Sequence, residues 1–305
     1  MASTGGPSGP AGDTVWLAPR DLAFLLLINL IWGFNIVASK VGVSEIPPVL
    51  FTGLRFLVLS IVLAPVLRVL PQQMPMLIVA AMLSGALHFG LMFYGLSLAE
   101  DVSTVAIATQ LGVPFATLLS VWLLRERIGW RRKLGIGLSF VGILVIGFDP
   151  RVVGYLDGLA LVVLSTFVGS LGLILIKQLR DVRAMELQAW IATTSWPVLF
   201  LLSALLESGQ VAAMRTASWQ GWGAVLFTSL AASLVGHSGM YYLIRRYPVT
   251  SVAPLTVLAP VFGIVFGVTL LEDQLTVRML IGGAVTLCGV LIVARRGPRI
   301  VDTGT

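Results

Sequence analysis

The sequence has little charge and almost no cysteine, and both shortages limit what the protein can be. Charged residues make up 11% of the 305 positions, whereas an ordinary soluble domain carries about 25%. The one cysteine, Cys288, rules out an intramolecular disulfide. Hydrophobic residues account for 57% of the chain. A soluble core cannot use so much apolar surface, so the composition indicates a protein that lies in a membrane.

Carboxylates are missing from the apolar segments, and the chain has only two histidines. Every Asp and Glu falls at a segment end or in a link, including Glu100, Asp101, Glu272 and Asp273. Because an intramembrane carboxylate is the usual proton or sodium relay, its absence argues against a simple carboxylate-driven pump. A lipid-modifying enzyme would need a convergent Asp, Glu, Ser-His or metal set. We therefore expect a protein that is not an enzyme, with no catalytic residue, no metal and no cofactor.

Apolar segments of about 20 residues recur along the chain, each long enough to cross a hydrocarbon layer of roughly 30 Å. Residues 1–20 are interpreted as a disordered cytoplasmic tail and residues 297–305 as a second cytoplasmic tail. The predicted fold class is an all-α integral membrane protein. Its ten predicted transmembrane helices are at residues 21–39, 48–67, 76–98, 103–124, 131–147, 157–177, 185–206, 219–244, 249–271 and 277–294.

The basic residues predict the orientation of these helices. With the amino terminus in the cytoplasm, fifteen of the 20 Lys and Arg residues fall on the inner side and Arg55 falls within a span. Only Lys40, Arg151, Arg215 and Arg278 fall outside. Positive charge gathers on the cytoplasmic side of membrane proteins. We therefore expect a multi-pass protein of the inner (plasma) membrane with both termini cytoplasmic, whose net charge of +6 serves topology and lipid contact and not nucleic-acid binding.

An internal repeat divides the chain into two halves. Pro114 precedes Glu126 by twelve residues, and Pro260 precedes Glu272 by the same gap. Glycines seven residues apart follow both times, at 135 and 142 and at 282 and 289. Such a repeat indicates a doubled unit, here residues 21–150 and 151–296. Because each half holds five helices, an odd number, the two repeats are inverted in the membrane, as is usual in secondary transporters.

The sequence resembles the drug/metabolite transporter superfamily, in particular its ten-helix EamA-type members. The resemblance rests on Trp32-Gly33-Phe34-Asn35 with Lys40, on Pro47-Pro48 with Arg55, and on the two Pro-to-Glu segments. Within that superfamily the chain is most similar to bacterial exporters of amino acids, aromatic ones included. The resemblance implies a cavity between the halves lined by helices 1, 3, 4, 6, 8 and 9, with helices 5 and 10 peripheral.

Polar residues on the third predicted helix and on its counterpart, the eighth, are candidates for contact with substrate. His88 shares a face with Ser84 on the third helix, and His237 lies beside Ser233 and Tyr241 on the eighth. Two matching polar stripes predict a shared cavity, in which His88, His237 and Tyr241 contact the substrate. The alternative is that each histidine bonds a neighbouring serine or carbonyl and simply joins two helices.

Prolines in the fourth and ninth helices predict breaks at the same depth. A proline removes one backbone donor and leaves a carbonyl unpaired. Pro114 shares a face with Gln110, and Pro260 shares one with Thr256. Paired broken helices indicate a transporter binding site, so Gln110 and Thr256 are predicted to bind substrate and the two prolines to act in gating. The alternative is a packing kink without a ligand.

Four residues of the first two helices complete the candidate set. Trp32 is too deep for an interfacial belt residue and could stack on an aromatic substrate, or could pack against Gly33. Asn35, in the same motif, is a second candidate for substrate contact. Lys40 could anchor the helix end or guide an anion. Arg55 lies only about 10 Å along its helix at about 1.5 Å per residue, which favours pairing with a loop carboxylate over docking of substrate.

The predicted function is a secondary transporter that exports small amphipathic metabolites, with amino acids including aromatic ones as the first candidates. Two inverted halves would give alternating access to a central site. The alternative is broad efflux of drugs, nucleobases or other metabolites, and a non-transporting receptor is a third possibility. We expect the partners to be a small-molecule substrate and the lipid bilayer, with the protein a monomer or weak homodimer.

Overall fold

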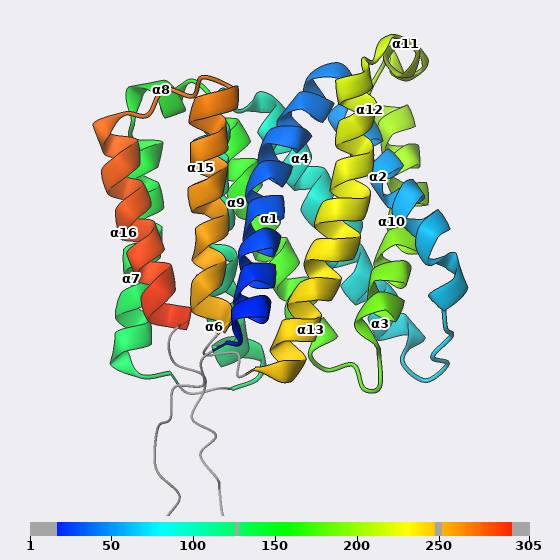
Figure 1. Cartoon of the computed structure of the whole chain (residues 1–305), viewed down its shortest axis with the longest axis horizontal. Helices are drawn as coiled ribbons and strands as arrows, with labels where there is room; N and C mark the ends of the chain where they lie inside the picture. The colour runs from blue at the N-terminus through cyan, green and yellow to red at the C-terminus, as the bar shows by residue number, and fades with distance from the viewer. Residues whose placement is uncertain (1–16, 126–127, 248–251, 295–305) are drawn as a thin grey trace, which may run out of the picture.

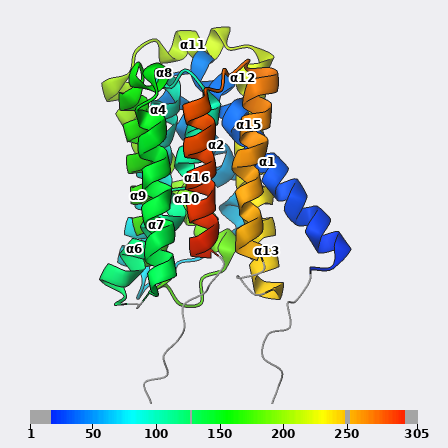
Figure 2. The same ribbon diagram turned by 90° about the vertical axis from the view of Figure 1, so that its left-hand side faces the viewer.

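The structure, a computed structural model, describes residues 17–125, 128–247 and 252–294, with all side chains except those of Tyr241, Ile244, Arg245, Ala253 and Pro254. This part of the chain forms a bundle of helices that run between two ends (Figure 1). We name these the α11 end, where α8 and α11 lie, and the α13 end, at which α1 begins and α16 finishes (Figures 1 and 2). The predicted Glu126 lies outside the described residues.

The first half follows the predicted spans with three irregular joints. Its third and fourth spans are each built of two α-helices, and a π-helical turn, η2, joins those of the third. The elements are α1 (Pro19–Glu45), α2 (Pro48–Leu63), η1 (Ala64–Val66), α3 (Met74–Met82), η2 (Leu83–Leu87), α4 (His88–Leu98), α5 (Val102–Thr109), α6 (Gly112–Leu123) and α7 (Trp130–Gly147).

The second half repeats this layout. Its long π-helical segment, η3, occupies the place in the eighth span that η2 occupies in the third, and a 3₁₀ segment, η4, opens the ninth. The elements are α8 (Pro150–Val153), α9 (Leu156–Ile176), α10 (Ala184–Leu206), α11 (Gln210–Thr216), α12 (Trp219–Leu226), η3 (Phe227–His237), α13 (Ser238–Arg246), η4 (Ala253–Val257), α15 (Leu258–Leu270) and α16 (Val277–Ala294).

The predicted all-α membrane fold is confirmed. Within the described residues, eight helical segments are long and apolar enough to cross a membrane, and Leu255–Leu270 is a shorter apolar helix. α7 supplies the remaining predicted span, with basic residues in its first turn. The first span is longer than predicted, because α1 continues to Glu45. Its last turns are less apolar, but they still pack on α2, where Gly42 leaves room for the ring of Phe51. Neither α8 nor α11, both short, was predicted.

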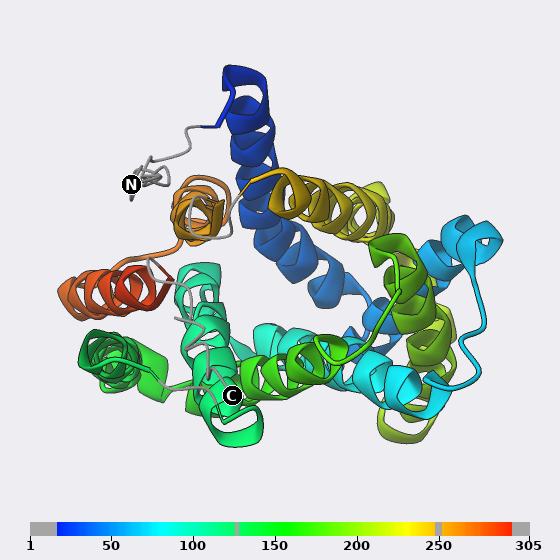
Figure 3. The same ribbon diagram turned by 90° about the horizontal axis from the view of Figure 1, so that it is seen from below.

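Contacts between the helices follow the two-fold pattern of an inverted repeat. α1 packs on α15 and η3, and its counterpart α9 packs on α6 and on η2 with α4. α2 packs on α10, and α7 packs on α16, so these counterparts meet each other directly. Viewed along the bundle, α7 and α16 stand side by side at one edge, away from α2 and α10 (Figure 3). The predicted peripheral place of the fifth and tenth helices matches this arrangement.

Reciprocal glycine contacts join α7 to α16. A Cβ added to Gly135 would lie 2.8 Å from the carbonyl oxygen of Gly289, and one added to Gly289 would lie 2.5 Å from that of Gly135. Gly142 and Gly282 meet in the same reciprocal way. Small residues allow such close backbone approach in membranes, where apolar burial alone does not bring helices together. The repeated glycines at 135, 142, 282 and 289 therefore join two helices of the same chain.

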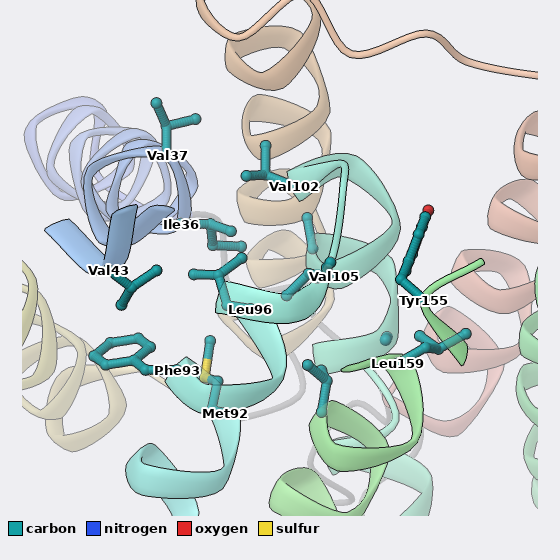
Figure 4. Packing of buried hydrophobic residues seen from close by; sticks show 14 of the residues in the cluster. Ile36, Val37, Val43, Met92, Phe93, Leu96, Val102, Val105, Tyr155 and Leu159 are labelled. Carbon is teal, nitrogen blue, oxygen red and sulfur yellow. The ribbon is translucent and has the colours of Figure 1, made fainter. Parts of the chain in front are cut away.

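A large apolar cluster fills the bundle toward the α11 end. Ile36 and Val43 of α1 meet Phe93 and Leu96 of α4, and Val102 begins α5 alongside them; each is at most 8% exposed (Figure 4). The cluster extends through Leu159 to α9 and includes Tyr155.

Gly142→Ala tests the contact between α7 and α16. The new methyl group would overlap the backbone of α16, and we expect destabilisation of about 1–3 kcal/mol, the usual effect of overpacking. Gly137→Ala is the matched control, because Gly137 is exposed on the same helix and an added Cβ meets nothing within 4 Å. Thermal unfolding of both purified variants in detergent would compare them. Equal melting temperatures would contradict the close contact.

Candidate functional site

Arg55 of α2 is a cation buried in the middle of the bundle, with 1% of its surface exposed. Its Nη2 and Nε donate to the hydroxyl of Ser233 in η3, at 2.8 and 3.3 Å. Its Nη1 has no hydrogen-bond partner among the described residues. The expected pairing of Arg55 with a loop carboxylate is wrong, because α2 directs the side chain inward, toward η3 and α4.

Three phenylalanine rings surround the guanidinium. Its central carbon lies 4.1 Å from the ring centre of Phe89, 5.3 Å from that of Phe93 and 5.5 Å from that of Phe56. Cation–π contacts are worth about 0.5–2 kcal/mol and are stronger when water is excluded. They stabilise the charge in part, but unlike a carboxylate they do not neutralise it.

η3 is the element that brings the site together. Its Ser233 holds Arg55, and its Ser229 donates to the backbone carbonyl of Arg55 at 3.0 Å. Ser233 in turn donates to the carbonyl of Thr228, five residues earlier, at 2.8 Å. The wider π-helical turn thus sets Ser229 and Ser233 on the side that faces α2.

Trp32 and His237 meet at the contact between α1 and η3. The indole Nε1 of Trp32 donates to the carbonyl oxygen of Ala232 at 3.2 Å, and its ring lies 5.4 Å from that of His237. Gly236 provides the room, because a Cβ there would overlap the indole. Gly33 instead faces α15, so Trp32 and Gly33 pack against different helices. Both Trp32 and His237 keep some accessible surface.

His88 occupies the matching place in the other half. Its Nδ1 is 2.7 Å from the carbonyl oxygen of Ser165 in α9, and its ring packs on Gly169. This contact joins α4 to α9, as the structural alternative for the histidines expects, yet the ring is only partly buried. His88 precedes Phe89, over whose ring the guanidinium of Arg55 lies, and His237 lies four residues beyond Ser233, which accepts from that guanidinium. The structure therefore gathers Arg55, His88 and His237 in one region.

The predicted helix breaks occur at matching positions. α5 ends at Thr109 and α6 begins at Gly112, so Gln110 lies at the joint just before Pro114. In the ninth span Thr256 lies in η4, just before Pro260 of α15. The side chain of Gln110 is half-buried and has no hydrogen-bond partner among the described residues. Both predicted helix breaks are thus found, and the role of the two prolines in gating stays a prediction.

Asn35 and Tyr241 are two further candidates, and the structure describes the side chain of Asn35 alone. Asn35 lies one turn beyond Trp32 on the same face of α1 and is buried, and its Oδ1 has no partner among the described residues. The side chain of Tyr241 lies outside the described part. The ammonium of Lys40 donates to the carbonyls of Leu96 and Ala99 at the end of α4, a contact of the anchoring kind.

Carboxylates close the α11 end by bonding to the N-termini of neighbouring helices. Asp273 accepts hydrogen bonds from the backbone of Val102 and Ser103 at 3.1 and 2.9 Å, and from the Ser103 hydroxyl. Glu207 accepts from the first residues of α2, and Glu45 from Ser218 at the start of α12. Each contact joins one half of the chain to the other. Burial raises the pKa of the Asp273 carboxyl above its ordinary value.

Two clefts open toward the α13 end. One, of about 730 Å³, is lined by α1, the start of α10, η3 and α13, and the other, of about 600 Å³, by η1 and the residues just after it, with the start of α10 and α13. Both volumes lie in the usual range of ligand pockets, about 300–1,000 Å³. Neither is lined by Arg55 or a histidine, but both reach Ser238, next to His237. The second predicted span, which includes η1, and the seventh, which is α10, thus contribute to these clefts, although neither was in the expected cavity lining.

Two inverted halves, broken helices and a buried polar centre define a multi-pass membrane protein of the secondary-transporter class. The chain belongs to the EamA-like transporter family, whose model matches residues 21–148 and 156–295. The suspected superfamily is thereby confirmed.

Similar proteins cover most of the chain. A "probable amino-acid metabolite efflux pump" of Salmonella typhimurium is 26% identical over 90% of this chain and 95% of its own length. The pump of the same name from Escherichia coli is 24% identical over 90% and 95%, and an uncharacterized Bacillus subtilis transporter, YoaV, is 22% identical over 88% and 94%. A solved crystal structure, 18% identical, matches 92% of this chain and 99% of its own with a TM-score of 0.60, which shows the fold alone.

Ser233→Ala tests how Arg55 is held. The change removes the hydroxyl that accepts from Nε and Nη2, and hydrogen bonds to charged groups are worth about 1.5–3 kcal/mol. We expect destabilisation of that size in denaturant unfolding of the purified protein. Ser97→Ala is the control, because Ser97 is partly exposed and bonds only within its own helix. If both variants were as stable as the parent, Ser233 would not support the guanidinium.

Proposed function

We propose that this protein exports small amphipathic metabolites, first among them amino acids with aromatic side chains, by alternating access of its two halves. The observation that carries the proposal is the buried polar centre of Arg55, His88 and His237 between helices of both halves. A central site at the interface of inverted repeats is the usual plan of secondary transporters. The names of the Salmonella and Escherichia coli relatives favour amino acids as substrates.

In this proposal Trp32 and Asn35 of α1, the two histidines, and Tyr241 contact the substrate. Gln110 and Thr256, at the broken helices, do the same, while Pro114 and Pro260 permit the bending that gates the site. The halves, residues 21–150 and 151–296, move relative to each other, with α7 and α16 as their fixed contact at one edge. No lipid-modifying chemistry is proposed, since the family is one of transporters.

The proposed orientation places the α13 end in the cytoplasm of a bacterial inner membrane. Arg20, Arg68 and the basic start of α7 lie at this end, whereas Arg151 and Arg215 lie at the other, in accord with the positive-inside rule. The carboxylate contacts then close the outer side and the clefts open inward. A solute would enter from the cytoplasm in this conformation, as export requires.

Counterflow in proteoliposomes tests the proposed function. Vesicles loaded with unlabelled phenylalanine should accumulate labelled phenylalanine, and competition by methionine and threonine would define the range. Trp32→Ala should lower the rate on the order of tenfold, the effect of losing an aromatic contact of up to about 1.5 kcal/mol. Trp122→Ala is the matched control, because that ring is 76% exposed. Counterflow of nucleobases or drugs, with none of amino acids, would favour the alternative function.

Cysteine labelling tests the proposed outer closure. In a Cys288→Ser background, Thr104→Cys places a thiol in the buried start of α5, which an impermeant thiol reagent added outside should reach slowly. Adding Asp273→Ala should speed labelling at least about tenfold, because each charge-assisted hydrogen bond is worth roughly 1.5–3 kcal/mol. Asp157→Ala, an exposed carboxylate bonded only to its neighbour, is the control. Equal rates in both would contradict this gate.

A further inference from the structure

We propose that Arg55 is the receptor for the carboxylate of the transported solute, and that its open Nη1 makes a carboxylate a requirement for recognition. This inference rests on the proposed export function and narrows its substrate class to organic anions and zwitterions. The guanidinium, the two histidines and Trp32 would together bind one solute, with its carboxylate at Arg55 and its side chain toward Trp32.

The first observation is an imbalance of charge. Arg55 is 1% exposed. Only its Nε and Nη2 have a partner, and that partner is a neutral serine hydroxyl. Within the described part of the chain, both ion pairs, Arg183 with Glu186 and Arg246 with Asp21, lie at the α13 end and involve other residues. Buried charges are normally paired. An ionisable residue inside a membrane without a protein counter-ion is therefore a candidate site for a ligand of opposite charge.

The second observation is the unused donor group. Arginine has five N–H donors in a planar fork that matches a carboxylate. Ser233 accepts from Nε and Nη2, which leaves the N–H groups of Nη1 buried and without a partner among the described residues. An unmet buried donor on a charged group costs more than an ordinary lost hydrogen bond. A carboxylate oxygen at Nη1 would satisfy this donor and neutralise the charge in one contact.

The third observation is the apolar wall on the remaining side of the guanidinium. Phe56, Phe89 and Phe93 exclude water there, and charge interactions strengthen as the local dielectric falls. We assign the approach of the solute to the side of the histidines, which keep accessible surface, because His237 lies four residues beyond Ser233, the partner of Arg55, in η3. The indole of Trp32, 5.4 Å from His237, would then contact the solute's apolar part.

A single arginine also limits the anion. Phosphate esters carry up to two negative charges and are bound by several basic groups. Among the described residues, the guanidinium of Arg55 bonds to one serine hydroxyl and lies over three phenylalanine rings, and neither ion pair includes it. A monocarboxylate therefore fits better than a phosphorylated metabolite.

The test compares ligands that differ only at the carboxylate. Phenylalanine, phenylalaninamide, which lacks the negative charge, and 3-phenylpropionate, which lacks the ammonium, compete for counterflow of labelled phenylalanine. We expect 3-phenylpropionate to compete and phenylalaninamide to be weaker by about 10–100-fold, the equivalent of one charge-assisted hydrogen bond. Equal competition by phenylalaninamide and phenylalanine would overturn the inference while leaving the export function in place.

Binding without transport separates the two proposals. The same three compounds are added to purified protein in detergent, and the shift of its melting temperature is measured. Stabilisation by the two carboxylates but not by the amide, without any counterflow, would support Arg55 as a receptor and contradict export of amino acids. Failure of all three compounds in both assays, with folded protein, would overturn both proposals.

Variants assign the effect to Arg55. Arg55→Lys keeps the charge but loses the fork, and should reduce the preference for phenylalanine over phenylalaninamide, while Arg55→Gln should abolish that preference. Arg215→Gln, an exposed arginine of α11, is the matched control and should leave it unchanged. If Arg55→Gln does not fold, Arg55→Lys still decides, because an unaltered preference in folded Arg55→Lys with unchanged affinity for phenylalanine would contradict recognition through Nη1.

Discussion

A positive charge in the middle of a membrane bundle is the constraint on which this structure depends. Arg55 is fully buried, and water is excluded on the side of its three phenylalanines. To hold it, α2 must pack against α4 on one side and η3 on the other, and η3 must turn two serines toward α2. The π-helical geometry of η3 is a local departure from the α-helix of the kind often found at functional sites. The charge thus links three spans from both halves.

Close backbone contacts make room for this centre. At α7 and α16 glycines meet glycines across the pseudo-two-fold, and at Gly33 α1 approaches the backbone of α15. Where a glycine faces a large ring, as Gly236 faces Trp32 and Gly169 faces His88, the absence of a side chain seats a functional candidate. Small residues therefore serve two purposes here: some bring helices together and others position aromatic side chains. The sequence pattern alone did not distinguish these two uses.

Much of the fold could be predicted from periodicity and charge, and much of the site could not. Segment lengths, the repeat and the paired prolines follow from simple rules of hydropathy and backbone chemistry, and they placed Gln110 and Thr256 at joints between helices. Arg55 was misjudged because its distance along α2 was known but its direction was not. The outer carboxylates Glu207, Glu45 and Asp273 are engaged elsewhere, because all three bond to the N-termini of helices. The acceptors of Lys40, carbonyls at the end of α4, were likewise not evident from its position along α1.

The contacts of the carboxylates at the α11 end offer a reason why the described residues place no carboxylate beside Arg55. At the α11 end Asp273, Glu207 and Glu45 each bond to backbone donors of a helix N-terminus, where the helix dipole also favours negative charge. Such contacts can break one at a time as the halves separate, because water replaces the partner at the surface. A carboxylate beside Arg55 would instead form a buried ion pair, and removing it would leave an uncompensated charge. If the protein supplied that carboxylate, the solute would have to compete with it. A site that keeps the cation and omits the anion leaves the favourable pairing for the solute that crosses the membrane.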